Sequence, residues 1–170
     1  VGVVAATSDS VSDLLRQMAA EDGGWPEGVR SLVRGTDTVV RWCTLALVKS
    51  GTVTLQVAKQ RRPMVVFYQK TNPGFFVAAK FIVSTKVFSL PNVLAGKRIV
   101  PELIPYFGGP KALVREAERL IRDPAEVAGQ REEIEKVLAT FAGINAAGRA
   151  ADAIEEVLGL SKPAGASAPG

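Results

Sequence analysis

The chain has 170 residues, 47% of them apolar and 22% charged, proportions that are typical of one folded domain and exclude a disordered chain. No stretch approaches the ~20 consecutive apolar residues that a membrane-spanning helix needs. The single cysteine, Cys43, excludes an internal disulfide framework and suits a reducing compartment. We interpret Cys43 as a small core residue, because the sequence has no histidine to activate a thiol.

The first half of the chain is predicted to alternate strands and helices. Strands are expected at Val1–Thr7, buried on both faces, at Val29–Val33, at Leu45–Val48 and at Met64–Tyr68. Helices are expected between them at residues 11–22, with Ser8, Asp9 or Ser10 as the cap, and at residues 52–60, and residues 36–43 are expected to form a short helix or a turn. This alternation predicts parallel βαβ units and an α/β fold with a doubly wound, Rossmann-like sheet.

The second half is predicted to become helical. A helix is expected to start at Pro73, a last short strand at Val87–Leu90, and only helices after Pro101, at residues 110–122, 124–142 and 145–158. Residues 161–170 are low in complexity, and we expect a disordered tail there. Because Val1 is not a start methionine, we expect the chain to be processed or to belong to a longer protein.

The net charge of +4 hides a strongly basic middle. Residues 30–98 carry twelve basic side chains and one acid, Asp37, whereas both flanking regions are acidic. Such an asymmetry favours an anionic partner, either the phosphates of a small ligand, a nucleic acid or an anionic membrane surface. A solvated basic face that keeps the protein soluble is the alternative.

Two turns are candidates for ligand contact, because each follows a predicted strand. Ser50-Gly51-Thr52 joins a strand to a helix, and its glycine, hydroxyls and free N–H groups suit a phosphate. The same tripeptide is also typical of an ordinary strand-to-helix turn. In Ser89-Leu90-Pro91-Asn92, the amide of Asn92 suits a sugar or a base, although it can equally cap its own turn. The carboxyl ends of parallel strands meet at one edge of the sheet, so we expect both turns there.

Lysines and aromatic residues are mixed between Pro73 and Lys86. This composition suits an anionic lipid surface, but core packing with outward lysines explains it as well. Acid–base groups are scarce nearby, since no Asp or Glu occurs between Asp37 and Glu102. We therefore expect no catalytic residue and no metal site in this chain, and a binding function instead.

The segments SGTVTLQVAKQRRPMVVFYQ and VFSLPNVLAGKRIVPELI, in this order and spacing, resemble the C-terminal half of lipid-A-disaccharide synthase. A later stretch, Arg149–Leu158, also resembles the family. The resemblance implies one half of a GT-B fold, with residues 1–160 forming the nucleotide-sugar-binding domain and the N-terminal acceptor domain missing. It also implies that the last helix crosses back to that missing domain.

The family's reaction joins UDP-2,3-diacylglucosamine to 2,3-diacylglucosamine 1-phosphate with inversion, at the cytoplasmic face of the inner membrane. The resemblance implies these two substrates, no cofactor, peripheral contact with an anionic membrane and no nucleic-acid partner. It places Ser50, Gly51 and Thr52 at the diphosphate and Asn92 at the donor site.

Gln56 occupies the position of the family's ribose-binding glutamate. An amide offers one acceptor oxygen where a carboxylate offers two. The family's catalytic aspartate and a donor-binding arginine also have no counterpart here. A stand-alone or inactive nucleotide-sugar-binding module, and a different two-domain UDP-sugar transferase, therefore stay open as alternatives.

Overall fold

The computed structural model describes residues 1–69, 87–106 and 108–159. The chain divides into two compact units, Val1–Leu138 and Ala139–Gly170. The helix expected from Pro73, the mixture of lysines and aromatic residues between Pro73 and Lys86, and the tail expected at 161–170 lie outside the described residues.

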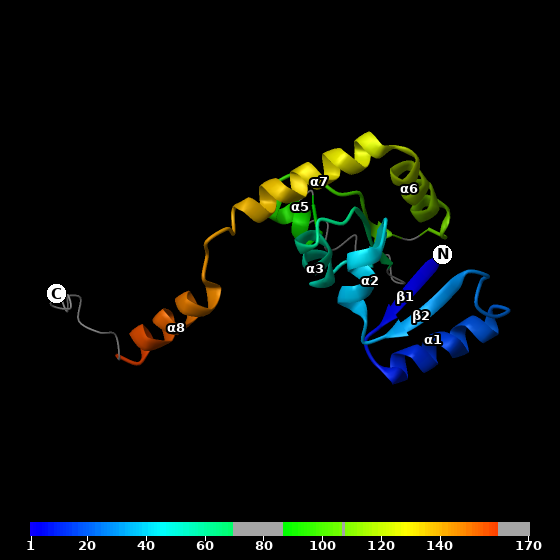
Figure 1. Ribbon diagram of the computed structural model, residues 1–170, viewed down its shortest axis with the longest axis horizontal. Helices are drawn as coiled ribbons and strands as arrows, with labels where there is room; N and C mark the ends of the chain where they lie inside the picture. The colour runs from blue at the N-terminus through cyan, green and yellow to red at the C-terminus, as the bar shows by residue number, and fades with distance from the viewer. Residues whose placement is uncertain (70–86, 107, 160–170) are drawn as a thin grey trace. The chain divides into compact units, whose positions relative to one another are not determined.

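The first unit is an α/β fold built on parallel strands, as the sequence predicted (Figure 1). Its elements are β1 (Gly2–Ala6), α1 (Asp9–Glu21), β2 (Val29–Val33), α2 (Thr36–Trp42), β3 (Ala46–Lys49), α3 (Val53–Lys59), β4 (Met64–Gln69), α5 (Leu90–Ala95), β5 (Glu102–Tyr106), α6 (Lys111–Arg122) and α7 (Pro124–Ala139). Among the described residues the strands form two sheets, β1-β2 and β3-β4-β5.

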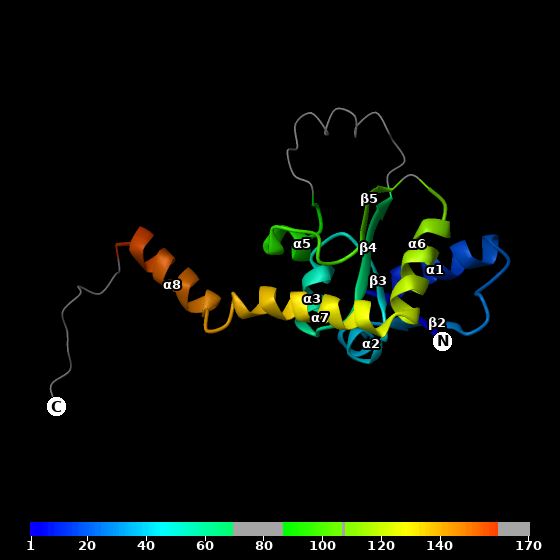
Figure 2. The same ribbon diagram turned by 90° about the horizontal axis from the view of Figure 1, so that it is seen from above.

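Strand β4 is the centre of the larger sheet, because it pairs with β3 on one side and with β5 on the other. Met64, Val65 and Val66 are fully buried, and this β-branched apolar run suits a strand covered on both faces. In the register, Val48 faces Val66, and Val66 in turn faces Glu102. The ladder therefore carries the ends of β3 and β4 to the same edge of the sheet (Figure 2).

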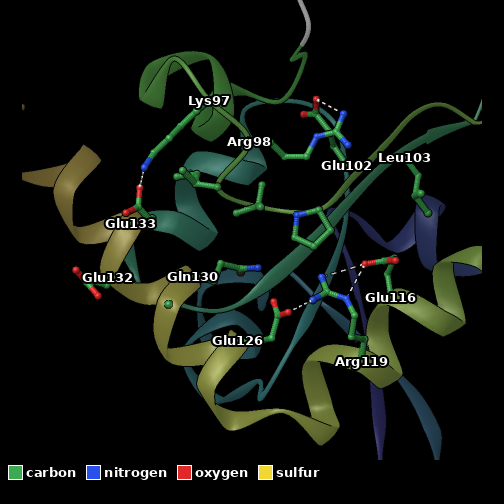
Figure 3. Close-up of a pocket in the computed structure, with 14 residues that line it drawn as sticks. Lys97, Arg98, Glu102, Leu103, Glu116, Arg119, Glu126, Gln130, Glu132 and Glu133 are labelled. Atoms are coloured by element: carbon green, nitrogen blue, oxygen red, sulfur yellow. Dashed lines mark hydrogen bonds and ion pairs between the residues drawn. The ribbon is translucent and has the colours of Figure 1, made fainter.

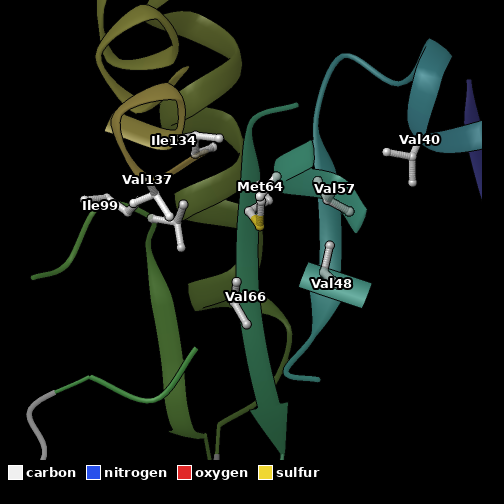
Figure 4. Close-up of a cluster of buried hydrophobic side chains, with 10 residues drawn as sticks. Val40, Val48, Val57, Met64, Val66, Ile99, Ile134 and Val137 are labelled. Atoms are coloured by element: carbon white, nitrogen blue, oxygen red, sulfur yellow. The ribbon is translucent and has the colours of Figure 1, made fainter. Parts of the chain in front are cut away.

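A single apolar cluster fixes helices to this sheet (Figure 4). Met64 and Val66 of β4 and Val48 of β3 meet side chains from α2, α3 and α7 and from the loop before β5. Its labelled members are Val40, Val48, Val57, Met64, Val66, Ile99, Ile134 and Val137. Because α3 and the loop before β5 share this core, the segments next to the predicted ligand turns rest on the rigid part of the fold.

The first strand was predicted to be buried on both faces, and this prediction was wrong. Val3 is 46% exposed, and only Ala6 of β1 is buried. The reason is that β1 pairs with β2 alone, so two strands with α1 and α2 beside them cannot cover both faces. Leu14 and Met18 of α1 are exposed for the same reason.

The prediction of a strand at Val87–Leu90 was also wrong. Residues 87–89 are not assigned to a strand, and Leu90 begins helix α5, with Pro91 in its first turn. The strand expected here lies instead at Glu102–Tyr106, within a region that was predicted to be helical. The backbone N–H groups of Phe88 and Ser89 bond to the Glu102 carboxylate, so they are not available to a neighbouring strand.

The three C-terminal helices were predicted correctly, and α6 and α7 belong largely to the first unit. Helix α8 (Ala146–Val157) lies in the second unit, where the Asn145 side chain caps it by accepting from the Gly148 N–H at 2.9 Å. No residue of α8 is buried, and Val157 is 86% exposed. Nothing in the described part of the second unit covers the apolar side of this helix.

Candidate functional site

The Ser50-Gly51-Thr52 turn leaves the end of β3 and enters α3. The Ser50 N–H donates to the Phe67 carbonyl at 2.8 Å, which extends the β3–β4 ladder by one residue. Thr54 is fully buried below the turn, and both its N–H and its hydroxyl donate to the Gly51 carbonyl, at 3.1 and 2.7 Å. The inner side of the turn is therefore fixed by the fold.

The outer side of the turn is open. Gly51 and Thr52 are exposed, and a Cβ built on Gly51 meets no atom within 4 Å. The φ of Gly51 lies outside the left-handed region, so this backbone does not itself require glycine. In the described chain, the N–H groups of Gly51, Thr52 and Val53 have no hydrogen-bond partner, and Thr52 makes no side-chain cap. These donors are available to an anion outside the protein.

A positive charge lies beside the turn. Lys49 ends β3 immediately before Ser50, and its ammonium lies 5.4 Å from the ring centre of Tyr68 at the end of β4. Gln56 is exposed on α3, four residues after Thr52 and so on the same side of the helix. The predicted diphosphate residues, Gln56 and a lysine thus share one accessible surface at the carboxyl edge of the sheet.

Asn92 lies on α5, which packs against α3 (Figures 1 and 2). Its side chain is 0% exposed. The amide nitrogen donates to the Val100 carbonyl at 2.9 Å and to Glu102 at 2.8 Å, and the oxygen accepts from the N–H groups of Ile99 and Val100, at 2.7 and 2.9 Å. An amide has two N–H donors and two lone pairs, so every group is used inside the protein. Direct contact between Asn92 and a ligand stays a prediction.

Glu102 is a functional candidate that the sequence reasoning missed. Its carboxylate is 0% exposed and accepts from the N–H groups of Phe88 at 3.1 Å and Ser89 at 2.9 Å, as well as from the Asn92 amide. In the sequence analysis, Glu102 was considered only as the residue that ends the stretch without Asp or Glu. The signal was an acid inside the apolar run VPELI, because a charge in such a run needs partners elsewhere in the fold.

A groove of about 600 Å³ lies between residues 97–103, which include Glu102, and helices α6 and α7 (Figure 3). Its charged side chains pair with one another: Lys97 with Glu133 at 2.5 Å, and Arg119 with Glu126 at 2.5 Å and with Glu116 at 3.1 Å. Lys136 and then Lys97 hold the pKa of Glu133 below its usual value. The lining has more acidic than basic side chains, and its lysine and arginines pair with carboxylates, so the groove does not favour an anion.

Cys43 was predicted to be a small core residue, but it is not a member of the buried apolar cluster. It is half-buried after α2, and its thiol donates to the Val40 carbonyl at 3.2 Å. Burial raises the pKa of the Cys43 thiol, which disfavours the nucleophilic thiolate. Over the described ranges, no three metal-ligating side chains gather, and no helix there is long and apolar enough to span a bilayer.

Comparison with known proteins connects this site to a family. The family model for lipid-A-disaccharide synthetase matches residues 31–151, which include the open turn, Gln56, Asn92 and Glu102. The chain belongs to the lipid-A-disaccharide synthase family.

Individual members of the lipid-A-disaccharide synthase family are similar over most of the chain. The synthase of Solibacter usitatus is 41% identical over 117 residues, covering 67% of this chain and 30% of that protein. The synthase of Anaeromyxobacter dehalogenans (strain 2CP-C) is 38% identical over 134 residues, which are 79% of this chain and 34% of the relative. The synthase of Paramagnetospirillum magneticum is 32% identical over 169 residues, covering 95% and 42%. The chain thus spans about a third of the length of the first two synthases.

The family match covers most, but not all, of the helices and strands. It begins within β2 and ends within α8, so β1 and α1 lie outside it. The segment that resembles the lipid-A-disaccharide synthase motif SLPN-LAGR--VPEL forms α5, its left-handed C-cap Gly96 with φ 65°, and the start of β5. The contact between Asn92 and Glu102 joins the two ends of that motif.

Proposed function

We propose that this chain is the UDP-sugar-binding part of an inverting glycosyltransferase of lipid A biosynthesis. The donor would be UDP-2,3-diacylglucosamine and the acceptor 2,3-diacylglucosamine 1-phosphate. The observation that carries the proposal is the turn at Ser50–Thr52, which is fixed from below by Thr54 and open above Gly51. Membership of the lipid-A-disaccharide synthase family supports the identity of the ligand.

In this proposal the diphosphate of UDP lies over the turn. The unpartnered N–H groups of Gly51, Thr52 and Val53 donate to phosphate oxygens, and the hydroxyls of Ser50 and Thr52 add further donors. The space above Gly51 lets a phosphate approach the backbone closely. Gln56 receives the ribose hydroxyls, and helix α5, which carries the buried Asn92, borders the donor sugar.

The proposed contribution to the reaction is stabilisation of the leaving group. When the acceptor hydroxyl attacks the anomeric carbon from the opposite face, the bond to UDP breaks and negative charge grows on the diphosphate. N–H donors and the Lys49 ammonium at the turn favour that charge. The sequence has no histidine and no Asp or Glu between Asp37 and Glu102, and Glu102 itself is buried and hydrogen-bonded within the fold, so no carboxylate or imidazole base is expected at this turn. The base and the acceptor site would belong to the acceptor domain of the complete enzyme, and this chain alone would not transfer sugar.

The proposal also gives the chain a place in the cell. An enzyme that handles diacylated sugars would work at the cytoplasmic face of the inner membrane, in peripheral contact with anionic lipid. The basic stretch at residues 30–98 supports an anionic partner. No nucleic acid is part of the proposal.

A nucleotide-sugar-binding module without catalytic activity is the second candidate. Gln56 favours it, because this side chain replaces a carboxylate that would accept both ribose hydroxyls. A complete enzyme with a weakened donor site and an inactive module differ in turnover but both bind UDP.

The test is calorimetric titration of the chain with UDP, comparing wild type with Gly51→Leu. Because no atom of the described residues lies within 4 Å of a Cβ at Gly51, the leucine should leave the fold intact and fill the phosphate space. Gly129→Leu is the matched control, since Gly129 is exposed on α7 with equally open space around it. Loss of UDP binding in Gly51→Leu alone supports the proposal. Equal binding by both variants would refute it.

A further inference from the structure

The buried carboxylate of Glu102 is surrounded by N–H donors, so the side chain at this position must accept hydrogen bonds. One oxygen, Oε2, accepts from Ser89 N–H at 2.9 Å, from the Asn92 amide at 2.8 Å and from Phe88 N–H at 3.3 Å. The other, Oε1, accepts from Phe88 N–H at 3.1 Å. The Arg98 guanidinium lies 3.9 Å away and is largely exposed. A buried carboxylate with several N–H donors is stable, whereas removal of its charge leaves these donors without an equivalent partner.

These bonds hold the segment that leads into α5. Phe88 and Ser89 directly precede the helix, and their N–H groups would otherwise be free at its start. Asn92, one turn later, joins the same carboxylate to the N–H groups of Ile99 and Val100. Glu102 and Asn92 therefore fix both the entry to α5 and the loop that returns to β5.

We infer that Glu102 is a positioning residue for the nucleotide-sugar site, an inference that rests on the proposed function. Helix α5 packs against α3, the helix that begins at the open turn. Glu102 is too deeply buried to touch a ligand. It acts by holding Phe88–Asn92 beside α3, so that this segment and the Ser50–Thr52 turn form the two sides of one site. Asn92 acts with Glu102 in this role.

The first experiment replaces Glu102 by glutamine, which keeps the shape but presents an NH₂ group to N–H donors. We expect UDP affinity to fall at least tenfold, measured by calorimetry, and amide exchange of Phe88 and Ser89 to accelerate at least tenfold without UDP. Gln130→Met is the control for lost stability alone, because Gln130 is also buried and bonds both the N–H and the carbonyl of Met64. This control should lower the melting temperature while changing UDP affinity less than twofold.

The second experiment tests the pair. Asn92→Asp alone places two carboxylates together and should weaken UDP binding as strongly as Glu102→Gln. In the double variant, the new amide at position 102 can donate from the Oε2 position to the new carboxylate at position 92, and its oxygen, at the Oε1 position, can accept from the Phe88 N–H, although the bond from Ser89 is lost. UDP affinity should therefore recover at least threefold over either single variant.

Three outcomes would overturn the inference: affinity that survives in Glu102→Gln, an equal loss in Gln130→Met, or a double variant no better than the singles. Wild type that binds no UDP would overturn the proposed function instead. The exchange rates of Phe88 and Ser89 would then still decide whether Glu102 holds the segment.

Discussion

The side-chain amide of Asn92 donates to the carboxylate of Glu102 across 2.8 Å, and both groups are fully buried. The two residues are ten positions apart, one in helix α5 and the other at the start of strand β5. Their contact closes the loop between these elements, because Asn92 also bonds the backbone of Ile99 and Val100. A polar pair thus fixes a segment whose apolar residues, such as Val93 and Leu94, are half-exposed and pack little.

Asn92→Ala should destabilise the chain by about 3 kcal/mol, because it removes one donor to Glu102 and the side-chain partner of the buried Ile99 and Val100 backbone groups. The free energy of unfolding in urea measures this. Ser8→Ala, which removes the exposed N-cap bond of α1 and an exposed hydroxyl contact with Ser10, should cost about 1 kcal/mol or less. An equal, small effect of both substitutions would contradict the role assigned to Asn92.

Gln56→Glu should tighten UDP binding by about 1 kcal/mol, or roughly fivefold, because a carboxylate forms charge-assisted bonds with ribose hydroxyls. Gln56 is exposed, so the substitution should not alter the fold. Calorimetry on both proteins measures the gain. Equal or weaker binding by the glutamate variant would remove Gln56 from the proposed site.

Removal of the Lys136 ammonium should raise the pKa of Glu133 more than removal of the Lys97 ammonium. Lys136 lies 2.8 Å and Lys97 2.5 Å from its carboxylate, and the hydrogen bond from Lys136 lowers the pKa most. A carboxyl with a lowered folded pKa stabilises the protein above its unfolded pKa, and that contribution disappears as pH falls through the folded value. NMR titration should show a higher Glu133 pKa in Lys136→Met than in Lys97→Met. The opposite order would be inconsistent with these contacts.

Amides of α8 should exchange much faster than those of β4. Helix α8 has 12 residues and none of them is buried, and an isolated helix of that length is marginal in water. Hydrogen exchange on the monomeric chain compares the two elements directly. Protection of α8 equal to that of Met64–Val66 would show that another part of the protein covers it.

Local patterns in the sequence predicted most of the first unit. The strand at Val29–Val33 was predicted with the observed bounds, and Met64–Tyr68 missed only one residue of β4. These elements have apolar runs or regular alternation, and the fold leaves that pattern intact. The open turn at Ser50–Thr52 was also predicted, because a strand and a helix with clear patterns flank it.

Local sequence patterns could not predict that Leu90 begins a helix and does not end a strand. Phe88 and Ser89 look like the end of a strand until Glu102 is known to bond their N–H groups. That partner is distant in sequence and interrupts its own apolar strand. The burial of Asn92 was missed for the same reason, since its four bonds depend on tertiary structure.

The central claim is that UDP binds over the turn between β3 and α3, and amide NMR during a UDP titration tests it most directly. The account predicts the largest shift changes at the N–H groups of Gly51, Thr52 and Val53, which have no partner in the described chain. Phe88 and Ser89 should follow with smaller changes. Shifts confined to the groove around Lys97 and Arg119, or no shifts at millimolar UDP, would contradict it.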